Sequence, residues 1–306
     1  MPTLTNNQKY LAQCIARNDL QAARRALLNV LAEDTSQKNA GFVSETIAAL
    51  KEKPELPAAY EGILLGGYVS DGEISRYYCT GREKAAADTI IKMHAAAEKL
   101  GEMHIHYTNA ALLYGPSGCG KTMFAKYVAH RMGLPMYYVN FASAVDSLLG
   151  GTAKNIGRVF RCAKEIPCVL LLDEIDCVAL KREGHGQKGP DGELERTTIS
   201  IMQNLDELPN SAVVIAATNR PDIIDPALMR RFTQKYEVAA PAAQEAGKIV
   251  DLFFSSIGQE NPYPESAAEE MYRESGGTPA ALMAKVVQSL AEQIAAEESE
   301  CAQEKS

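Results

Sequence analysis

A glycine-rich run in the middle of the chain has the residue types and spacing of a phosphate-binding loop. Residues 115–122 read Gly-Pro-Ser-Gly-Cys-Gly-Lys-Thr, between an apolar run and a helical pattern. Glycines let backbone amides turn inward onto a phosphate, and the following helix adds the positive end of its dipole. We expect Lys121 to reach the β- and γ-phosphates of a nucleotide and the Thr122 hydroxyl to ligate Mg²⁺. The predicted nucleotide-binding residues of this run are Gly115, Pro116, Ser117, Gly118, Cys119, Gly120, Lys121, Thr122 and Met123.

Two adjacent carboxylates follow about fifty residues later. Residues 169–172 are Val-Leu-Leu-Leu, and Asp173 and Glu174 come directly after them. A buried parallel strand presents such acids at its carboxyl end, where ligands bind in open α/β sheets. Asp173 is expected to hold Mg²⁺ through water, and Glu174 to polarise the attacking water. Taken alone, the pair would equally fit the cap of a following helix, so its assignment depends on the phosphate loop.

Alternating strand and helix patterns surround both motifs. Short apolar runs predict strands at 110–114, 136–139, 169–172, 213–217 and 235–238, with helical patterns between them. This alternation is typical of βαβ units and a parallel sheet, which places the chain in the α/β class. Helical patterns also occupy residues 20–33, 41–51, 82–100, 242–256, 265–274 and 279–297.

The composition is that of a soluble globular chain. Of its 306 residues, 46% are hydrophobic and 23% are charged, which excludes a disordered chain, a collagen-like fibre and a disulfide miniprotein. No apolar run approaches the roughly 18 residues of a membrane span, and the N-terminus lacks the layout of a signal peptide. The net charge of −8 gives no field that would attract nucleic acid or anionic lipid.

Cysteine and histidine spacing gives little support for a metal centre held by these residues. The seven cysteines are an odd number without a C-x-x-C pair, which favours a reducing cytoplasm over a disulfide framework or a structural zinc. Glu102, His104 and His106 form E-x-H-x-H. Their alternation with apolar residues is more simply interpreted as a half-exposed extended segment than as metal ligands.

Together with a third block, these motifs resemble the AAA ATPases, the group that includes katanin, spastin and the membrane-anchored AAA proteases. The third block, residues 216–232, contains Ala-Ala-Thr-Asn-Arg-Pro-Asp and Asp-Pro-Ala-Leu-Met-Arg-Arg-Phe. The resemblance covers about residues 108–290, and this block is more specific than the phosphate loop, which many NTPases share. The fold implied is a P-loop NTPase sheet with flanking helices, followed by a small all-α lid and preceded by a helical region.

The implied domains are a helical N-terminal region at 1–66, a linker and helix at 67–107, a large α/β nucleotide-binding subdomain at 108–240, a helical lid at 241–298 and a polar tail at 299–306.

The resemblance also implies catalytic roles. Asn219 matches the polar residue that orients the attacking water beside Glu174. Arg230 and Arg231 match arginine fingers that reach the γ-phosphate held by a neighbouring subunit, which implies a homo-oligomeric ring, most simply a hexamer. With Lys121, these residues make up the expected catalytic set, and the expected cofactors are ATP and Mg²⁺.

Two segments depart from the family pattern. The segment 276–282 matches the part of the lid that packs on ribose and adenine, which assigns Ala280 to the nucleotide, but Pro279 and Ala281 replace its usual glycine and acid. Leu148 stands where translocating relatives carry a pore-loop aromatic, so its grip on a threaded polypeptide would be weaker. The polar loop 181–192 would form a second pore loop or a solvated connector.

The function predicted is an ATP-driven cytoplasmic ring that remodels a protein partner. One alternative is a nucleic-acid-associated ATPase of the helicase-loader or clamp-loader type, which the acidic balance and the 7% aromatic content disfavour. Another is an adaptor that binds ATP but hydrolyses it slowly, which intact Glu174, Asn219 and Arg230 disfavour. The run Gly-Glu-Leu at 192–194 is similar to small standalone bacterial AAA proteins, some of which pair with a separate protease. The sequence does not identify the client.

Overall fold

The computed structural model describes residues 4–16, 26–27, 29–31, 33, 38–41, 43, 56–141, 152–179 and 190–303, with the side chains at 6, 13–14, 140, 152–154, 190–194 and 296–303 left out. The chain divides into two compact units, Met1–Glu55 and Leu56–Ser306. In the first unit, helix α1 spans Asn6–Ala16, and the side chains of Thr5 and Asn7 donate hydrogen bonds to Glu33 at 3.2 and 2.6 Å. The helices predicted at 20–33 and 41–51 fall mostly outside the described residues.

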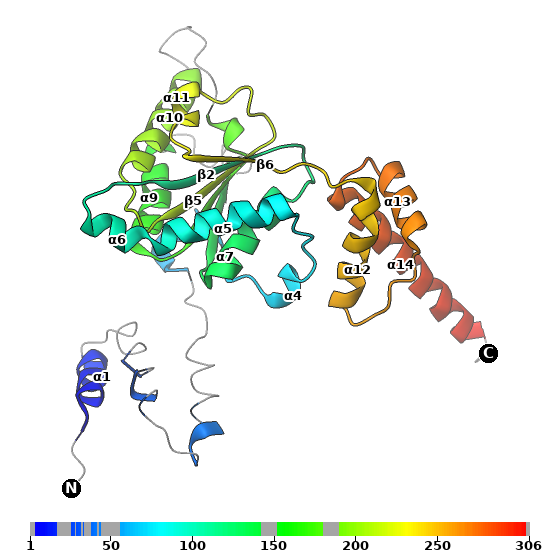
Figure 1. Cartoon of the computed structure of the whole chain (residues 1–306), viewed down its shortest axis with the longest axis horizontal. Helices are drawn as coiled ribbons and strands as arrows, with labels where there is room; N and C mark the ends of the chain where they lie inside the picture. The colour runs from blue at the N-terminus through cyan, green and yellow to red at the C-terminus, as the bar shows by residue number, and fades with distance from the viewer. Residues whose placement is uncertain are drawn as a thin grey trace. The chain divides into compact units, whose positions relative to one another are not determined.

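The second unit is built on a six-stranded sheet in the order β1-β3-β4-β5-β2-β6. Its strands are β1 Leu65–Gly67, β2 Asn109–Tyr114, β3 Met136–Asn140, β4 Val169–Asp173, β5 Val213–Thr218 and β6 Gln234–Glu237. Figure 1 labels strands β2, β5 and β6 of this sheet. Strands β2 to β6 pair in parallel, so the predicted α/β class is confirmed. Each central strand is buried on both faces, which is why these segments read as continuous apolar runs.

Strand β1 was not expected from the sequence. It pairs antiparallel with β3 at the sheet edge, with Gly66 opposite Tyr137. Gly66 has φ +119°, and a Cβ atom there would lie 2.2 Å from the Met136 carbonyl oxygen. Gly66, which resembles part of a flexible linker in the sequence, therefore permits a close approach of two backbones.

Helices cover both faces of the sheet. One face packs against α5 (Gly81–Ala95) and α7 (Lys121–Met132), through side chains such as Ile90, Phe124 and Leu113. The other packs against α9 (Thr152–Glu165) and α10 (Pro190–Asp206), through side chains such as Phe160 and Leu112. Leu112 and Leu113 point to opposite faces, as the two-residue period of a strand requires. The shorter elements are α4 Asp71–Ile74, α6 Ala97–Glu102, α11 Pro226–Met229, and the 3₁₀ turns η1 Ala58–Tyr60 and η2 Ile175–Cys177.

A small helical layer follows the sheet. It consists of η3 Ala243–Glu245, α12 Ala246–Ser256, α13 Glu265–Glu274 and α14 Pro279–Gln303, at the positions where the sequence predicts helices. It has an apolar core of its own around Phe254, Tyr272 and Leu282. Upstream of the sheet, the helix predicted over 82–100 is divided at Ala96 into α5 and α6. No helix in the described ranges has both the length and the apolar character needed to cross a membrane.

Candidate nucleotide-binding site

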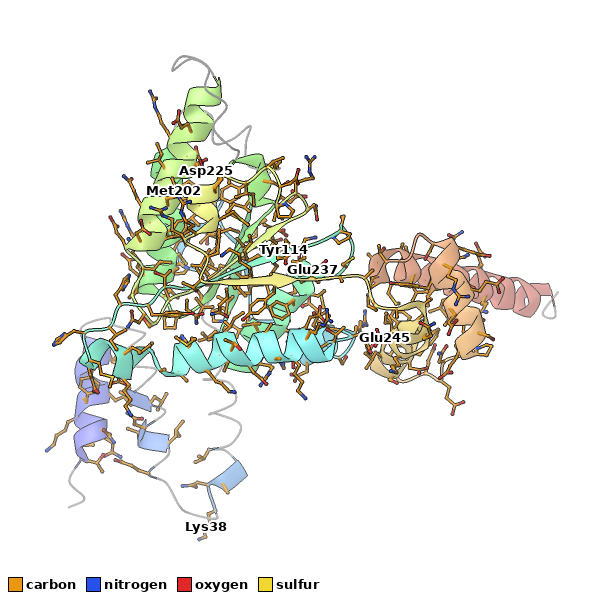
Figure 2. The ribbon with its side chains drawn as sticks, turned by 45° about the horizontal axis from the view of Figure 1, so that its top comes forward. Lys38, Tyr114, Met202, Asp225, Glu237 and Glu245 are labelled. Carbon is orange, nitrogen blue, oxygen red and sulfur yellow. The ribbon has the colours of Figure 1, made fainter. Side chains whose placement is uncertain are left out.

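Three neighbouring strands end at the same edge of the sheet. Tyr114 at the end of β2 is in register with Thr218 at the end of β5, and β4 lies on the other side of β5. Figure 2 shows Tyr114 beside Glu237, the last residue of β6, which flanks β2. The phosphate loop follows β2, the acidic pair ends β4 and Asn219 follows β5. The carboxyl edge of the sheet thus brings together three motifs that are far apart in the sequence.

The phosphate loop has a backbone that only glycine adopts easily. Gly115, Gly118 and Gly120 have φ values of +147°, +77° and +101°. At Gly115, a Cβ atom would lie 2.3 Å from the carbonyl oxygen of Val238. Helix α7 starts at Lys121 with Gly120 as N-cap and without a side-chain hydrogen bond at the cap. The positive end of this helix therefore faces the loop uncapped by any described side chain, as an anion site requires.

Lys121 connects the phosphate loop to the end of β5. Its side chain is buried, and its ammonium donates to the carbonyl oxygens of Gly115 and Pro116 at 2.9 and 2.8 Å and to Asn219 Oδ1 at 2.5 Å. These three bonds match the three protons of the group. Burial lowers the pKa of Lys121, an effect that nearby acidic groups oppose. Lys121 and Asn219, 98 positions apart in the sequence, are thus in direct contact.

The described residues fit a magnesium ion and its nucleotide. The Thr122 hydroxyl donates to Asp173 Oδ2 at 3.1 Å, which places a hydroxyl and a carboxylate oxygen side by side at the start of α7. Oxygen donors of this kind, completed by waters and phosphate oxygens, are what Mg²⁺ prefers. The positive-φ glycines and the uncapped helix start suit the phosphates that such an ion would accompany.

Glu174 is held in a conformation that is uncommon for a residue with a side chain. Its φ and ψ are 53° and 44°, in the left-handed region, which costs such residues about 1–2 kcal/mol. Its amide donates to Asp173 Oδ1 at 3.0 Å, and its carboxylate has no hydrogen-bond partner in the described part of the chain. Strain of this kind concentrates at functional sites, and a carboxylate without such a partner can accept a proton from water.

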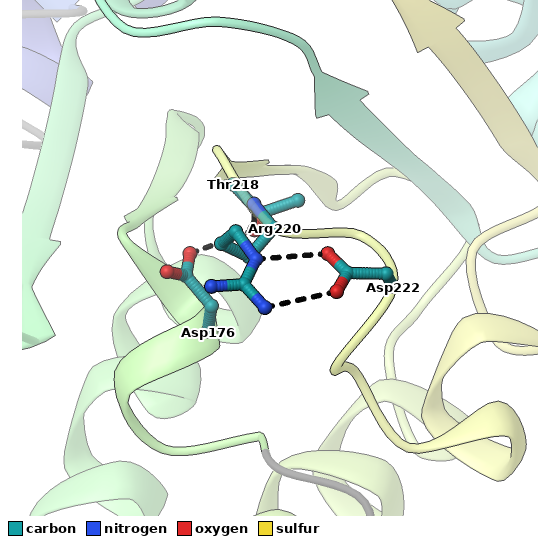
Figure 3. Close-up of polar contacts among 4 residues, drawn as sticks. All are labelled: Asp176, Thr218, Arg220 and Asp222. Atoms are coloured by element: carbon teal, nitrogen blue, oxygen red, sulfur yellow. Dashed lines mark hydrogen bonds and ion pairs between the residues drawn. The ribbon is translucent and has the colours of Figure 1, made fainter.

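A polar network missed by the sequence analysis involves Thr218 and Arg220, the residues on either side of Asn219 in the chain (Figure 3). The Thr218 hydroxyl donates to Asp176 Oδ1 at 2.7 Å and accepts from the Arg220 amide at 2.9 Å. The Arg220 guanidinium forms a bidentate ion pair with Asp222 at 3.0 and 2.9 Å. A threonine that ends an otherwise apolar strand was the available signal, but its partner Asp176 could not be identified without the fold.

The two candidate arginine fingers have different surroundings. Arg231 donates to Asp206 Oδ2 at 3.2–3.3 Å and to the Ala227 carbonyl oxygen at 2.8 Å. Arg230 is exposed; its backbone amide donates to the Pro226 carbonyl oxygen at 3.3 Å, and its side chain has neither a hydrogen bond nor an ion pair with another described residue. No hydrogen bond or ion pair joins either arginine to a described residue of the phosphate loop of its own chain. The structure thus does not join them to the cluster formed by Lys121 and Asn219.

The first turn of α14 contacts the phosphate loop. The Ala280 amide donates to the Gly118 carbonyl oxygen at 3.2 Å, and a Cβ atom at Gly118 would lie 3.2 Å from both Ala280 Cβ and Thr278 Oγ1. Cys119 is buried, whereas Ser117 is exposed and Met123 is half-buried. A direct contact between Ala280 and a nucleotide stays a prediction.

The remaining sequence predictions concern residues outside this site. Leu148 and residues 181–189 lie outside the described residues. The half-exposed extended segment predicted around His104 is wrong, because α6 runs to Glu102 and His104 turns the chain with φ +56°. Met103 and Ile105 are consequently exposed, at 59% and 48%. Among the described residues, no three His, Cys, Asp or Glu side chains are grouped as a metal site.

Comparison with known families and curated proteins gives consistent matches. The family model described as "ATPase family associated with various cellular activities (AAA)" matches residues 111–240. An uncharacterized AAA family ATPase, y4kL, of Sinorhizobium fredii is 33% identical over 184 residues, which are 60% of this chain and 55% of that protein. The ATP-dependent zinc metalloprotease FtsH 1 of Conexibacter woesei is 35% identical over 185 residues, 56% of this chain and 28% of that protein.

A third curated relative and a solved structure also match this chain. The proteasome-activating nucleotidase of Methanococcus vannielii is 39% identical over 171 residues, which cover 54% of this chain and 40% of that protein. Across these three relatives, the matched region spans 28–55% of their length. Among solved structures, the FIGL-1 AAA domain in complex with ADP has a TM-score of 0.57 at 21% identity, covering 78% of this chain and 76% of that one. At this identity, the structural match concerns the fold alone.

Proposed function

Because residues 111–240 form a domain of the AAA ATPase family, we propose that this chain binds Mg-ATP at its phosphate loop and uses hydrolysis to remodel a protein partner. The observation that carries the proposal is the convergence of the three motifs. Lys121 bonds Asn219 at 2.5 Å, and the neighbouring Thr122 bonds Asp173 at 3.1 Å. A loop that only bound a phosphate would need neither the carboxylates of Asp173 and Glu174 nor the side-chain amide of Asn219.

Each residue has a role that its position supports. Lys121 and the loop amides would bind the β- and γ-phosphates, and Thr122 and Asp173 would hold Mg²⁺. The Glu174 carboxylate would accept a proton from the attacking water, which Asn219 orients. When bound, Mg²⁺ would neutralise phosphate charge.

We infer that Arg230 and Arg231 complete the site of a neighbouring subunit. Charge builds on the phosphoryl oxygens in the transition state, and an arginine there accelerates the reaction by about 10³-fold or more. No hydrogen bond or ion pair joins either arginine to a described residue of its own phosphate loop, whereas a ring would bring it to the next subunit. A heterologous, closed arrangement of this kind is a ring, and we propose a hexamer.

The proposed partner is a protein. The names of two relatives, a metalloprotease and a proteasome-activating nucleotidase, associate their ATPase regions with proteolysis, and a separate protease is a candidate partner here. The five cysteines whose side chains the structure describes are free thiols, as the proposed reducing cytoplasm would require. An assay with unfolded polypeptide in one arm and single-stranded DNA in another tests this choice. We expect only the polypeptide to stimulate ATP hydrolysis, and stimulation by DNA alone would favour the nucleic-acid alternative.

Two single substitutions test the chemistry. Lys121→Ala removes the ammonium, so micromolar ATP affinity measured by calorimetry should be lost; its retention would rule out the phosphate-loop assignment. Glu174→Gln keeps the shape but cannot accept the proton, so ATP should bind while turnover stops. A kcat within about tenfold of wild type would show that another group acts as the base.

Mixed rings test the trans arrangement. Rings of Glu174→Gln subunits and rings of Arg230→Ala/Arg231→Ala subunits should each be inactive. A mixture should regain partial activity, because some intact Glu174 sites then meet intact arginines from a neighbour. Mixed rings that form but remain inactive would show that the arginines do not act in trans.

A further inference from the structure

The hydroxyl of Thr218 links the two loops that carry Glu174 and Asn219. Thr218 is the last residue of β5 and is 1% exposed. Its hydroxyl donates to Asp176 at 2.7 Å and accepts from the Arg220 amide at 2.9 Å, as Figure 3 shows. It therefore acts as donor and acceptor at once.

The Thr218–Asp176 bond lies beyond the residues through which β4 and β5 pair, although Thr218 still pairs with Tyr114 of β2. The pairing of β4 with β5 ends at Leu172 and Ala216. Beyond it, the Thr218–Asp176 bond joins η2, which Glu174 precedes, to the residue that precedes Asn219. The adjacent ion pair of Arg220 with Asp222 is about 60% exposed on both sides, and exposed pairs contribute only about 0–1 kcal/mol. The buried hydroxyl is thus the better candidate for fixing this geometry.

We propose that Thr218 and Asp176 are positioning residues that set the separation between Glu174 and Asn219. This inference rests on the proposed ATPase function, in which those two residues act on the same water molecule. A displacement of about 1 Å in such an arrangement can cost about 100-fold in rate. ATP binding depends instead on the phosphate loop, and no hydrogen bond joins a described residue of that loop to Thr218 or Asp176. Loss of the pair should therefore lower kcat while KM for ATP changes little.

The main test compares Thr218→Val with Thr218→Ser. Valine has nearly the shape of threonine but lacks the hydroxyl, and we expect kcat to fall about tenfold or more with KM within about threefold. Serine restores the hydroxyl, so its kcat should remain within about threefold of wild type. Asp176→Ala should reproduce the effect of Thr218→Val, and the double variant should be no slower than either single variant, because all three lose the same bond.

A buried hydrogen bond elsewhere in the sheet supplies the control. Asn109, at the start of β2, is 1% exposed and donates to the Ile90 carbonyl oxygen at 3.0 Å. Asn109→Ala should lower the melting temperature without lowering kcat per folded molecule. If it lowers kcat as much as Thr218→Val does, the effect is a general loss of stability and the positioning role is refuted.

A double-mutant cycle with Asn219 decides how Thr218 acts. In an Asn219→Ala background, Thr218→Val should cost much less than in wild type, because one of the groups being positioned is already absent. Full additivity would overturn the proposal, as would an active Thr218→Val enzyme with unchanged kcat. An inactive wild-type enzyme would instead refute the proposed function itself, so the two failures are distinguishable.

Discussion

Gly115→Ala should damage both folding and nucleotide binding, whereas Gly133→Ala should affect folding only. Both glycines have positive φ, +147° and +64°, which costs an alanine about 1–2 kcal/mol. A Cβ atom at Gly133 meets nothing within 4 Å, but at Gly115 it would lie 2.3 Å from the Val238 carbonyl oxygen. The backbone there must move, which endangers the 2.9 Å bond from the Val238 amide to Tyr114, worth about 1 kcal/mol.

Thermal unfolding and ATP calorimetry measure both effects. For a unit of roughly 250 residues, 1 kcal/mol corresponds to about 2–4 °C in Tm. Gly133→Ala should therefore lower Tm by about 2–8 °C with unchanged ATP affinity. Gly115→Ala should lower Tm further and weaken ATP binding about tenfold or more, because the Gly115 carbonyl also accepts a bond from Lys121. Equal losses of Tm in the two variants, or wild-type ATP affinity in Gly115→Ala, would refute the reasoning.

The remaining predictions concern the arginines and a loop thiol. Arg230→Ala should lower kcat with Tm unchanged, because the Arg230 side chain bonds no other described residue. Arg231→Ala should also lower Tm slightly by releasing Asp206; a larger Tm loss in Arg230→Ala would contradict this. Burial raises the pKa of Cys119 above its ordinary 9.0, so its neutral thiol should react with iodoacetamide at pH 7.5 about tenfold more slowly than an exposed cysteine, as mass spectrometry can measure. Because the pKa of Cys119 is raised in the folded state, the contribution of this thiol to stability is complete below pH 9 and declines as the pH rises toward that raised pKa. Fast labelling at pH 7.5 would show that Cys119 is not a buried, neutral thiol.

The sequence predicts best where one physical requirement dominates. The central strands are buried on both faces, so their apolar runs were recognisable. Strands β2 to β6 each lie within one residue of their predicted bounds. The phosphate loop was recognisable because its backbone requires glycine at several positions with positive φ. Both signals are local, and no knowledge of tertiary contacts was needed to interpret them.

The sequence predicts poorly where a residue depends on a distant partner. Gly66 has the signature of a linker, but its lack of a side chain serves a backbone contact with Met136. Thr218 could be placed at a strand end, but only the fold brings it to Asp176. Likewise, the pairing of Arg231 with Asp206, which distinguishes it from Arg230, joins α10 to the turn after α11. Such contacts are set by topology rather than by local pattern.

Two hydrogen bonds join the helical layer to the part of the unit that contains the nucleotide site. The layer has its own apolar core and is joined to the site by the bond from Ala280 to Gly118. A second bond, at 2.5 Å, runs from the Tyr78 hydroxyl to Glu245 and raises the pKa of Tyr78 to about 12. Bonds of this kind each contribute only about 0.5–1.5 kcal/mol. A ligand whose binding changes the conformation of the phosphate loop can break these bonds if its binding free energy differs by a comparable amount between the two conformations. Nucleotide binding at the loop can in this way shift the position of the helical layer.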